Sequence, residues 1–271
     1  MTRMSDAEIE ALALSLQIAL RSVLCSLPLA IFVAWLLTRR RFAGRSLLDA
    51  FVHLPMVLPP VMIGYVLLLL FGVRGPVGHW LHEHLGLQLA FTTAGAALAT
   101  AVMTFPLMVR SIRLALEHVD LGLEDAARNL GAGAFDRFAS VTLPLMTPGI
   151  LAGAVTAFVA SLGEFGAVIT FAGNVPGETR TLPIALYSAL QTPDGNDEAA
   201  RIALISFALG LAGLIASEWL ARQLRRQLGR LTCCTQRLRS SARSFPSMQP
   251  SMRRRPASPR CLENPAPARA P

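Results

Sequence analysis

The chain has 271 residues, of which 53% are hydrophobic and 15% are charged, and its mean hydropathy is +0.48. An ordinary soluble domain has roughly 25% charged residues, so this composition argues against that class and favours a membrane protein. The net charge of +8 comes from arginines, because the chain contains no lysine, and this excludes the lysine-dependent Walker A loop of ATP-binding proteins.

Five apolar runs are long enough to cross a membrane, since about 20 residues span the ~30 Å of hydrocarbon. They cover residues 11–37, 48–72, 90–116, 147–172 and 199–220. We therefore predict a membrane domain over residues 11–224, preceded by a short external segment, residues 1–10. Residues 225–271 turn to arginine, serine and proline. So little apolar surface predicts a disordered tail or, alternatively, a basic arm that touches anionic lipid.

The arginines between the runs predict how the chain is oriented, because cytoplasmic connections carry an excess of positive charge. They gather in the first connection, in the third and after the last run (Arg39, Arg40, Arg41 and Arg45; Arg113, Arg128 and Arg137; Arg222, Arg225, Arg226 and Arg230). The second and fourth connections carry little more than Arg74 and Arg180. We therefore predict the N-terminus outside and the C-terminus in the cytoplasm, and no nucleic-acid partner is needed to explain the charge.

The sequence lacks the common catalytic patterns. Neither H-E-x-x-H nor G-x-S-x-G occurs, and no run offers a nucleophile with a nearby base. The stretch "HWLHEH", with His79, His82 and His84, lacks the spacing of a zinc protease, and its tryptophan favours an interfacial anchor over a metal site. We expect no enzyme activity, no metal site and no cofactor in this chain.

A polar insert, "LEDAARNLGAGAFDRFASVTLP", separates the third and fourth runs. Asp120 or Glu124 can begin a short helix that Gly131 ends, because acidic groups favour helix N-termini and glycine favours the position after the last turn. Apolar residues at Phe135, Phe138 and Val141 predict a second short helix, which Leu143 and Pro144 stop. Such a pair is either a knob that seats in a partner or a hairpin at the membrane surface.

The insert resembles the signature loop of ABC importer permeases, which reads E-A-A, three residues, G, nine residues, I-x-L-P. Asp125, Ala126 and Ala127 occupy the E-A-A positions, preceded by Glu124, and Gly131 occupies the glycine position. The I-x-L-P positions hold Val141, Leu143 and Pro144. In that family the loop docks on a separate ATPase subunit, so the resemblance implies the same role for these residues.

Three further segments are similar to bacterial molybdate permeases: "HLPMVLPPVMIGYVLLL" from His53, "MTFPLMVRSIRLALE" from Met103, and "SLGEFGAVITFAGNVPGETRTLP" from Ser161. The last occurs in looser form in sulfate and thiosulfate permeases, whereas "ITFAGN" and "IALYSALQTP" favour molybdate. The resemblance implies transport of molybdate. The alternatives are a sulfate, thiosulfate or tungstate permease of the same fold, or a membrane scaffold that transports nothing.

The fold class that the resemblance implies is an all-α membrane protein with about five transmembrane helices, the type I (MetI-like) ABC importer permease. It further implies a homodimer in the bacterial inner membrane that works by alternating access. The expected partners are two ATP-binding subunits, which hold ATP and magnesium, a periplasmic molybdate-binding protein, and membrane lipid.

A second set of residues is expected to line or gate the path of the anion: Pro59, Pro60, Ser161, Gly163, Glu164, Gly166 and Thr170. Prolines inside an apolar run remove helical hydrogen bonds, and glycines let helices approach, although helix packing alone also explains the glycines. A carboxylate repels an oxyanion, so Glu164 is expected to hold an outer gate through backbone donors or an arginine such as Arg180. Ser161 and Thr170 are the expected anion-facing groups.

Overall fold

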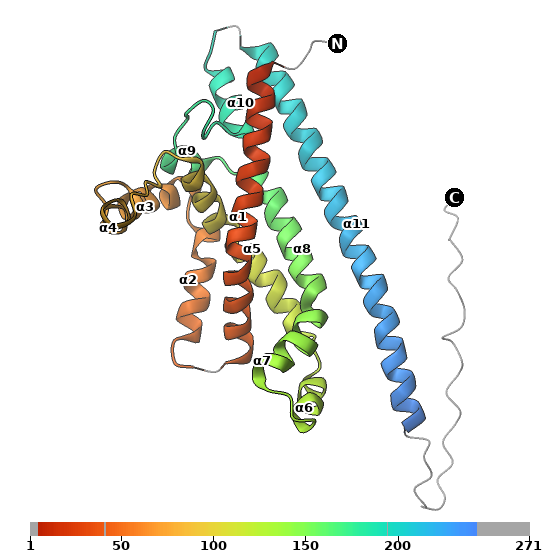
Figure 1. Ribbon diagram of the computed structural model, residues 1–271. Coiled ribbons are helices and arrows are strands. Elements are labelled where there is room, and N and C mark those ends of the chain that lie inside the picture. The colour runs from red at the N-terminus through yellow and green to blue at the C-terminus, as the bar shows by residue number, and fades with distance from the viewer. Residues whose placement is uncertain (1–4, 41, 194, 243–271) are drawn as a thin grey trace, which may run out of the picture. The chain divides into compact units, whose positions relative to one another are not determined.

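The computed structural model describes residues 5–40, 42–193 and 195–242, and every regular element within these ranges is helical. Contacts divide the chain into one unit over residues 1–226 and a second over residues 227–271. The first unit holds the helical bundle. Within it, α1 (Asp6–Arg39), α5 (Thr93–Glu117) and α8 (Leu143–Leu162) run beside one another, and α2 (Arg45–Val57) packs on α5 (Figure 1).

Helix α1, Asp6–Arg39, starts with a capping box. The Glu8 backbone N–H donates to Ser5 Oγ at 3.3 Å, and the Ser5 N–H donates to the Glu8 carboxylate at 2.9 Å. Glu8 also accepts a bond of 3.0 Å from Arg201 Nε and is 1% exposed. Residues 6–10, expected as an external segment, are therefore the first turns of α1, because this cap and ion pair extend the helix beyond its apolar run.

The predicted second run, residues 48–72, forms two helices. Helix α2 covers Arg45–Val57 and helix α3 covers Pro60–Phe71, with a bend of 116° between them. The break falls at Pro59 and Pro60, because a proline pushes the residue before it into extended backbone and has no N–H to continue the helix. Leu58, with φ −82° and ψ 146°, has that extended conformation. A short helix, α4 (Pro76–Leu85), follows.

Helices α5 (Thr93–Glu117) and α8 (Leu143–Leu162) form the centre of the bundle together with α1. They approach closely at Gly149, where an added Cβ would collide with the Cβ of Ala115. Ser111 Oγ donates to the Gly149 carbonyl at 3.1 Å and fixes the same crossing. Small residues therefore set the distance between the two helices, as is usual within membranes.

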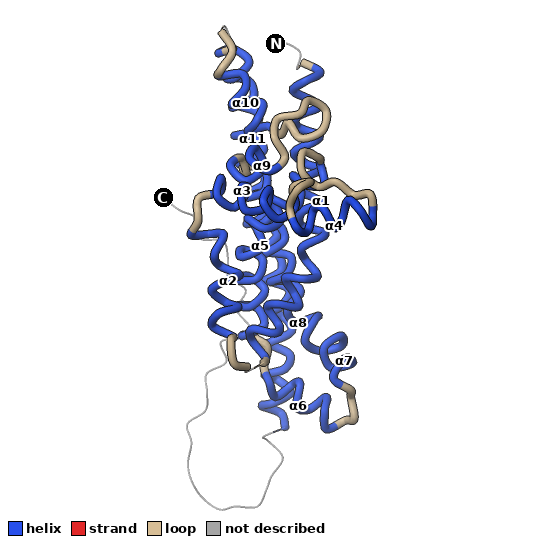
Figure 2. The backbone as a smooth tube through the Cα atoms, turned by 90° about the vertical axis from the view of Figure 1, so that its left-hand side faces the viewer, coloured by secondary structure: helices blue, strands red, loops and turns tan. Residues whose placement is uncertain are grey.

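The predicted fourth run, residues 147–172, is also interrupted. Helix α8 ends at Leu162 and helix α9 covers Gly166–Phe171, with a turn between them. Helix α10 (Leu182–Leu190) follows, and α6 (Leu121–Asn129) and α7 (Ala134–Arg137) lie at the opposite end of the bundle from α10 in both views (Figure 2). The interruption reflects Gly163, which has no side chain to pack and loses much conformational freedom in a helix.

Helix α11, Asn196–Ala242, contains the fifth predicted run. It packs near its start against α1 and α10, where Ala199 and Ile202 are buried. The tail predicted to be disordered from residue 225 therefore begins inside a helix, because leucine, glutamine and arginine are good helix formers. Residues 243–271 of that tail lie outside the described residues.

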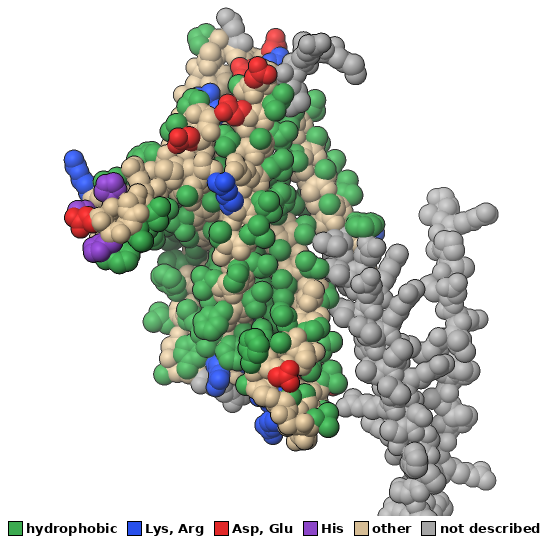
Figure 3. All heavy atoms as spheres, in the orientation of Figure 1, with side chains coloured by type: hydrophobic (Ala, Val, Ile, Leu, Met, Phe, Trp, Pro, Cys, Tyr) green, Lys and Arg blue, Asp and Glu red, His purple; other side chains and the backbone are tan. Residues whose placement is uncertain are grey.

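Within the described residues, four helices are long and apolar enough to cross a membrane, and α2 with α3 adds a fifth if the pair forms one broken span. The four are Asp6–Arg39, Thr93–Glu117, Ala134–Leu162 and Asn196–Trp219. Hydrophobic side chains cover the middle of the face seen in Figure 3, while most acidic side chains lie toward its ends. The structure thus agrees with an all-α membrane protein of about five spans.

Candidate functional site

The polar insert forms a segment at one end of the bundle, made of α6 (Leu121–Asn129), α7 (Ala134–Arg137) and a π-helical turn, Phe138–Thr142. We call residues 120–142 the end segment. Asp120 begins α6, since its Oδ1 accepts a bond of 2.8 Å from the Gly122 N–H. Gly131 follows α6 with φ +90°, a left-handed conformation that glycine adopts without strain.

The second helix of the insert does not stop at Leu143 and Pro144 as the sequence predicts. Residues 134–162 are continuously helical. The π turn makes this possible, because the Leu143 N–H donates to the Phe138 carbonyl five residues earlier and leaves room for the proline ring. The end segment therefore continues directly into the apolar helix α8, and a force on one is transmitted to the other.

Glu124 joins the end segment to the bundle. Its Oε1 accepts a hydrogen bond from Arg39 Nη2 at 2.8 Å and another from Thr142 Oγ1 at 2.8 Å. Arg39 is the last residue of α1, and Thr142 is buried in the π turn. The Arg39 and Glu124 side chains are 17% and 22% exposed, so the bonds are largely shielded from water. Both bonds have an ionised acceptor, which makes them stronger than neutral bonds. One carboxylate thus connects α6, α1 and the start of α8.

The outer face of the end segment is exposed. Leu130 and Phe135 are 89% and 83% exposed, and Asp125 and Ala126 also face solvent. Asp125 lies 3.9 Å from Arg128 in an exposed pair that contributes little stability. Two large apolar side chains held in solvent beside polar ones are typical of a protein–protein contact. Of the two interpretations of the insert, the geometry favours the knob that seats in a partner.

The predicted path residues gather where α3 meets α9. A Cβ added at Gly166 would lie 2.7 Å from Pro60 Cβ, and one at Gly64 would lie 2.8 Å from Thr170 Cβ. Pro59 precedes α3, and Gly163 lies in the turn before α9. The two short helices therefore pack against each other with almost no space between their backbones.

Glu164 lies in the turn before α9 and accepts a hydrogen bond of 3.0 Å from the Ala167 N–H. It thus binds a backbone donor at the start of α9, one of the two partners expected for it. Arg180, the other, instead donates from Nε to Asn174 Oδ1 at 2.9 Å. The carboxylate fixes the conformation of the turn that leads into α9.

Ser161 is separate from this group. It is 7% exposed, donates to the Ala157 carbonyl at 2.7 Å, and lies 3.4 Å from Ser22 Oγ in α1. Thr170 donates to the Gly166 carbonyl at 2.8 Å. Both hydroxyl protons are used within the chain in this conformation, and the anion-facing role of the two residues stays a prediction.

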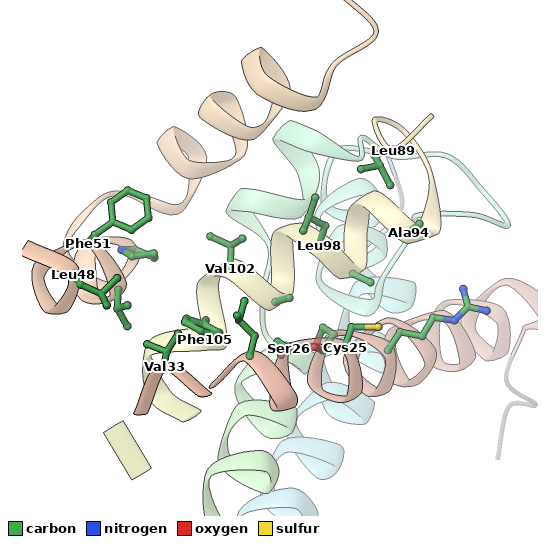
Figure 4. A pocket seen from close by; sticks show the side chains of 17 residues that line it. Cys25, Ser26, Val33, Leu48, Phe51, Leu89, Ala94, Leu98, Val102 and Phe105 are labelled. Atoms are coloured by element: carbon green, nitrogen blue, oxygen red, sulfur yellow. Dashed lines mark hydrogen bonds between the residues drawn. The ribbon is translucent and has the colours of Figure 1, made fainter. Parts of the chain in front are cut away.

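A cavity of about 850 Å³ lies between α1, α2 and α5. Figure 4 shows Phe51 of α2 and Val102 and Phe105 of α5 among the side chains that line it. The hydroxyls at its wall, Ser22 and Ser26, both donate to backbone carbonyls. Arg21 is the one charged side chain among the described lining residues, and most of the others are apolar. A dianion needs several hydrogen-bond donors, so this largely apolar cavity of a single chain offers it few.

Sequence reasoning missed the partners of Glu124. The arginine run at residues 39–41 predicts topology, but nothing in its spacing indicates that Arg39 bonds to a residue 85 positions away. Thr142 lies between the matched motif positions Val141 and Leu143 and escapes notice for the same reason. The one feature of the sequence that points to this contact is the position of Arg39 at the end of an apolar run, where a nearby carboxylate stabilises the charge.

The sequence profile described as "Binding-protein-dependent transport system inner membrane component" matches residues 26–227. The chain is 56% identical to the molybdenum transport system permease protein ModB of Escherichia coli (strain K12), over 84% of this chain and 99% of that protein. The ModB protein of Haemophilus influenzae (strain ATCC 51907 / DSM 11121 / KW20 / Rd) is 52% identical, over 82% and 97% of the two chains.

More distant relatives have lower sequence identity to this chain. The sulfate transport system permease protein CysT of Escherichia coli (strain K12) is 37% identical over 73% of this chain and 71% of that protein. Among solved structures, a bacterial alginate ABC transporter in complex with an alginate-bound periplasmic protein matches with a TM-score of 0.66. It is 17% identical, over 82% of this chain and 80% of that one, and therefore supports the fold alone. The predicted ABC importer permease fold is confirmed.

The Glu124 contacts predict that Glu124→Ala loosens the end segment. Hydrogen bonds to a charged group contribute about 1.5–3 kcal/mol, so amide hydrogen exchange across residues 120–133 should rise about tenfold or more. Asp125→Ala is the matched control, because its exposed pair contributes little. Hydrogen-exchange mass spectrometry of the purified protein measures both variants. Equal exchange in the two would show that Glu124 does not hold the segment.

Proposed function

Because the chain belongs to the family of binding-protein-dependent transport system inner membrane components, we propose that it is the permease subunit of an ATP-driven importer of molybdate. The observation that carries the proposal is the 56% identity to a molybdenum transport permease over nearly that protein's whole length. The chain is a transport subunit and not an enzyme. ATP hydrolysis belongs to a separate subunit, which holds the ATP and magnesium.

Molybdate is favoured over sulfate because the similarity to molybdenum permeases is much higher than the 37% identity to a sulfate permease. Molybdate, tungstate and sulfate are all tetrahedral dianions, so the same kind of donors would recognise each of them. A scaffold without transport activity would not need two interrupted helices packed together inside the membrane, since breaks of this kind serve sites and gates.

Two copies of the chain form the path at their interface. Support comes from the largely apolar lining of the cavity within one chain, where Arg21 is the one charged side chain among the described lining residues. The exposed faces of α2 and α3, with Phe51, Val57 and Tyr65 more than half exposed, leave apolar surface for a second copy or for lipid. A twofold pair is the commonest arrangement of such subunits.

The end segment docks on the ATP-binding subunit from the cytoplasm. Its exposed Leu130 and Phe135 provide the apolar contact, and Asp125, Ala126 and Ala127 occupy the matching motif positions. The arginine bias supports an orientation with the end segment inside the cell, the N-terminus outside and the C-terminus inside. A periplasmic binding protein delivers the anion to the outer end, where α10 lies.

Glu164 holds the outer gate by fixing the turn between α8 and α9. The α3–α9 contact is tight at Gly166 and Gly64, so α9 moves only together with α3. Closure of the two ATPase subunits on ATP pulls the end segments together, and the continuous helix 134–162 carries this movement to the turn at Gly163. The outer side then opens.

Uptake of radiolabelled molybdate into proteoliposomes tests the proposed function. The vesicles contain this chain, its ATP-binding subunit and its binding protein. We expect uptake that requires ATP and resists excess sulfate. If excess sulfate abolishes the uptake, the protein is a sulfate-type permease. Absence of ATP-dependent uptake of either anion would contradict the proposal that the chain belongs to an importer.

Gly131 is predicted to be required for coupling. An L residue at its φ of +90° costs about 1–3 kcal/mol, so Gly131→Ala should shift the end segment and lower ATP-dependent uptake several-fold. Gly133→Ala is the matched control, because both sites have open space around them but Gly133 has an ordinary φ of −64°. Equal uptake by the two variants would contradict a role for this turn.

Glu164 is predicted to keep the empty transporter closed. Glu164→Ala removes the acceptor for the Ala167 N–H and should raise basal ATPase activity while lowering uptake, whereas Glu164→Gln keeps an acceptor oxygen and should have a milder effect. ATPase activity with and without loaded binding protein measures the difference. Unchanged basal activity and uptake in the alanine variant would remove the gate assignment.

A further inference from the structure

A second hollow lies between the last turns of α1 and the end segment, with a volume of about 840 Å³. We call it the joint groove. Its α1 wall includes Phe32, Trp35 and Arg40, and its other wall includes Phe135, Arg137 and Phe138. Its lining includes the Arg39–Glu124 ion pair and Phe135, which is also assigned to the docking contact. The space between the two walls has no role in the function proposed above. Among its aromatic side chains, Trp35 is of a type that gathers at membrane interfaces.

The joint groove carries a net positive charge. Arg39, Arg40 and Arg137 line it, and Glu124 is the one carboxylate among the lining residues. Glu124 is already bonded to Arg39. Arg40 and Arg137 make no ion pair with any described carboxylate, and the Arg40 guanidinium lies 5.3 Å from the Trp35 ring centre. Two positive groups without a carboxylate partner among the described residues thus line an aromatic groove.

The length of the groove matches one membrane leaflet. Its α1 wall runs from Pro28 to Arg40. At ~1.5 Å per residue this stretch is ~18 Å long, compared with ~15 Å for half of the hydrocarbon core. The arginines therefore lie at the membrane surface when the apolar part of the groove reaches the middle of the bilayer. An acyl chain has no polar backbone to satisfy, whereas an extended peptide would bring unsatisfied backbone groups into hydrocarbon.

We propose that the joint groove binds one anionic phospholipid of the cytoplasmic leaflet. The headgroup phosphate bonds to Arg40 and Arg137, and an acyl chain lies along Phe32 and Phe138. Basic pockets between membrane helices on the cytoplasmic side are known to select such headgroups. The proposal depends on the orientation given above. Because the groove joins α1 to the end segment, the lipid also stabilises the segment in its docked position.

Lipid selectivity of the assembled transporter tests the proposal. The complex with its ATP-binding subunits is reconstituted in nanodiscs that contain phosphatidylglycerol and phosphatidylcholine, and native mass spectrometry counts the lipids that remain bound. We expect one retained phosphatidylglycerol per copy of this chain. The double variant Arg40→Gln/Arg137→Gln should lose this preference about tenfold or more, because each charge near the surface contributes to the affinity for anionic lipid.

Two control variants distinguish binding in the joint groove from a general effect of positive charge on lipid binding. Arg40→Lys/Arg137→Lys keeps both charges and should keep the preference, and Arg45→Gln removes an arginine that does not line the groove and should keep it too. Equal retention by the glutamine double variant, or equal retention of both lipids by the unaltered complex, would overturn the proposal.

A photo-reactive residue in place of Phe32 identifies the occupant directly. We expect an adduct with lipid, and an adduct with a second copy or with the ATP-binding subunit would overturn the proposal in favour of that protein. ATP-dependent molybdate uptake measured on the same preparation separates a failure of the lipid site from a failure of the proposed function. Uptake without lipid selectivity rejects the lipid site alone, whereas loss of the ATP-binding subunit on purification rejects the proposed function.

Discussion

One partly buried carboxylate determines how the exposed part of this molecule is attached to its membrane part. Glu124 accepts bonds from Arg39 at the end of α1 and from Thr142 at the start of the long helix 134–162. The apolar runs alone would leave α6 joined to the bundle only through its two connecting peptides. With these bonds, the segment that carries Leu130 and Phe135 cannot move without moving two transmembrane helices.

Two interrupted helices, one at Pro59 and Pro60 and the other at Gly163, are the second constraint on the fold. Backbone groups left free by Pro59, Pro60 and Gly163 must find partners inside the protein, because hydrocarbon offers none. The structure places both breaks at one contact, where α3 packs on α9 through Gly64 and Gly166. The end segment and this contact are connected by α8, so a movement that begins at the ATPase has a continuous helical route to the far side.

Much of this arrangement could be predicted from the sequence. Apolar runs of about 20 residues indicate membrane crossing whatever their neighbours do, and the signature motif locates the end segment by itself. The sequence did not reveal that Pro60 follows a break between two helices, whereas Pro144 lies within a continuous helix because a π turn accommodates it. That outcome depends on which side chains pack around the free carbonyls.

The partners of Glu124 could not be predicted either, since a contact across 85 residues leaves no local pattern. The start of α1 at Asp6 and the helical part of the tail up to Ala242 also went unpredicted, because capping and helix propensity act without apolar periodicity.

The most direct measurement of the central claim is the number of molybdate ions imported per ATP hydrolysed, in a double-mutant cycle of Arg39→Gln and Glu124→Gln. If the ion pair transmits the movement, each single variant hydrolyses ATP with less import, and the double variant is no worse than either single one. Additive losses would mean that the two residues act separately. An unchanged ratio in all three variants would contradict the account, because the end segment would then transmit its movement without this joint.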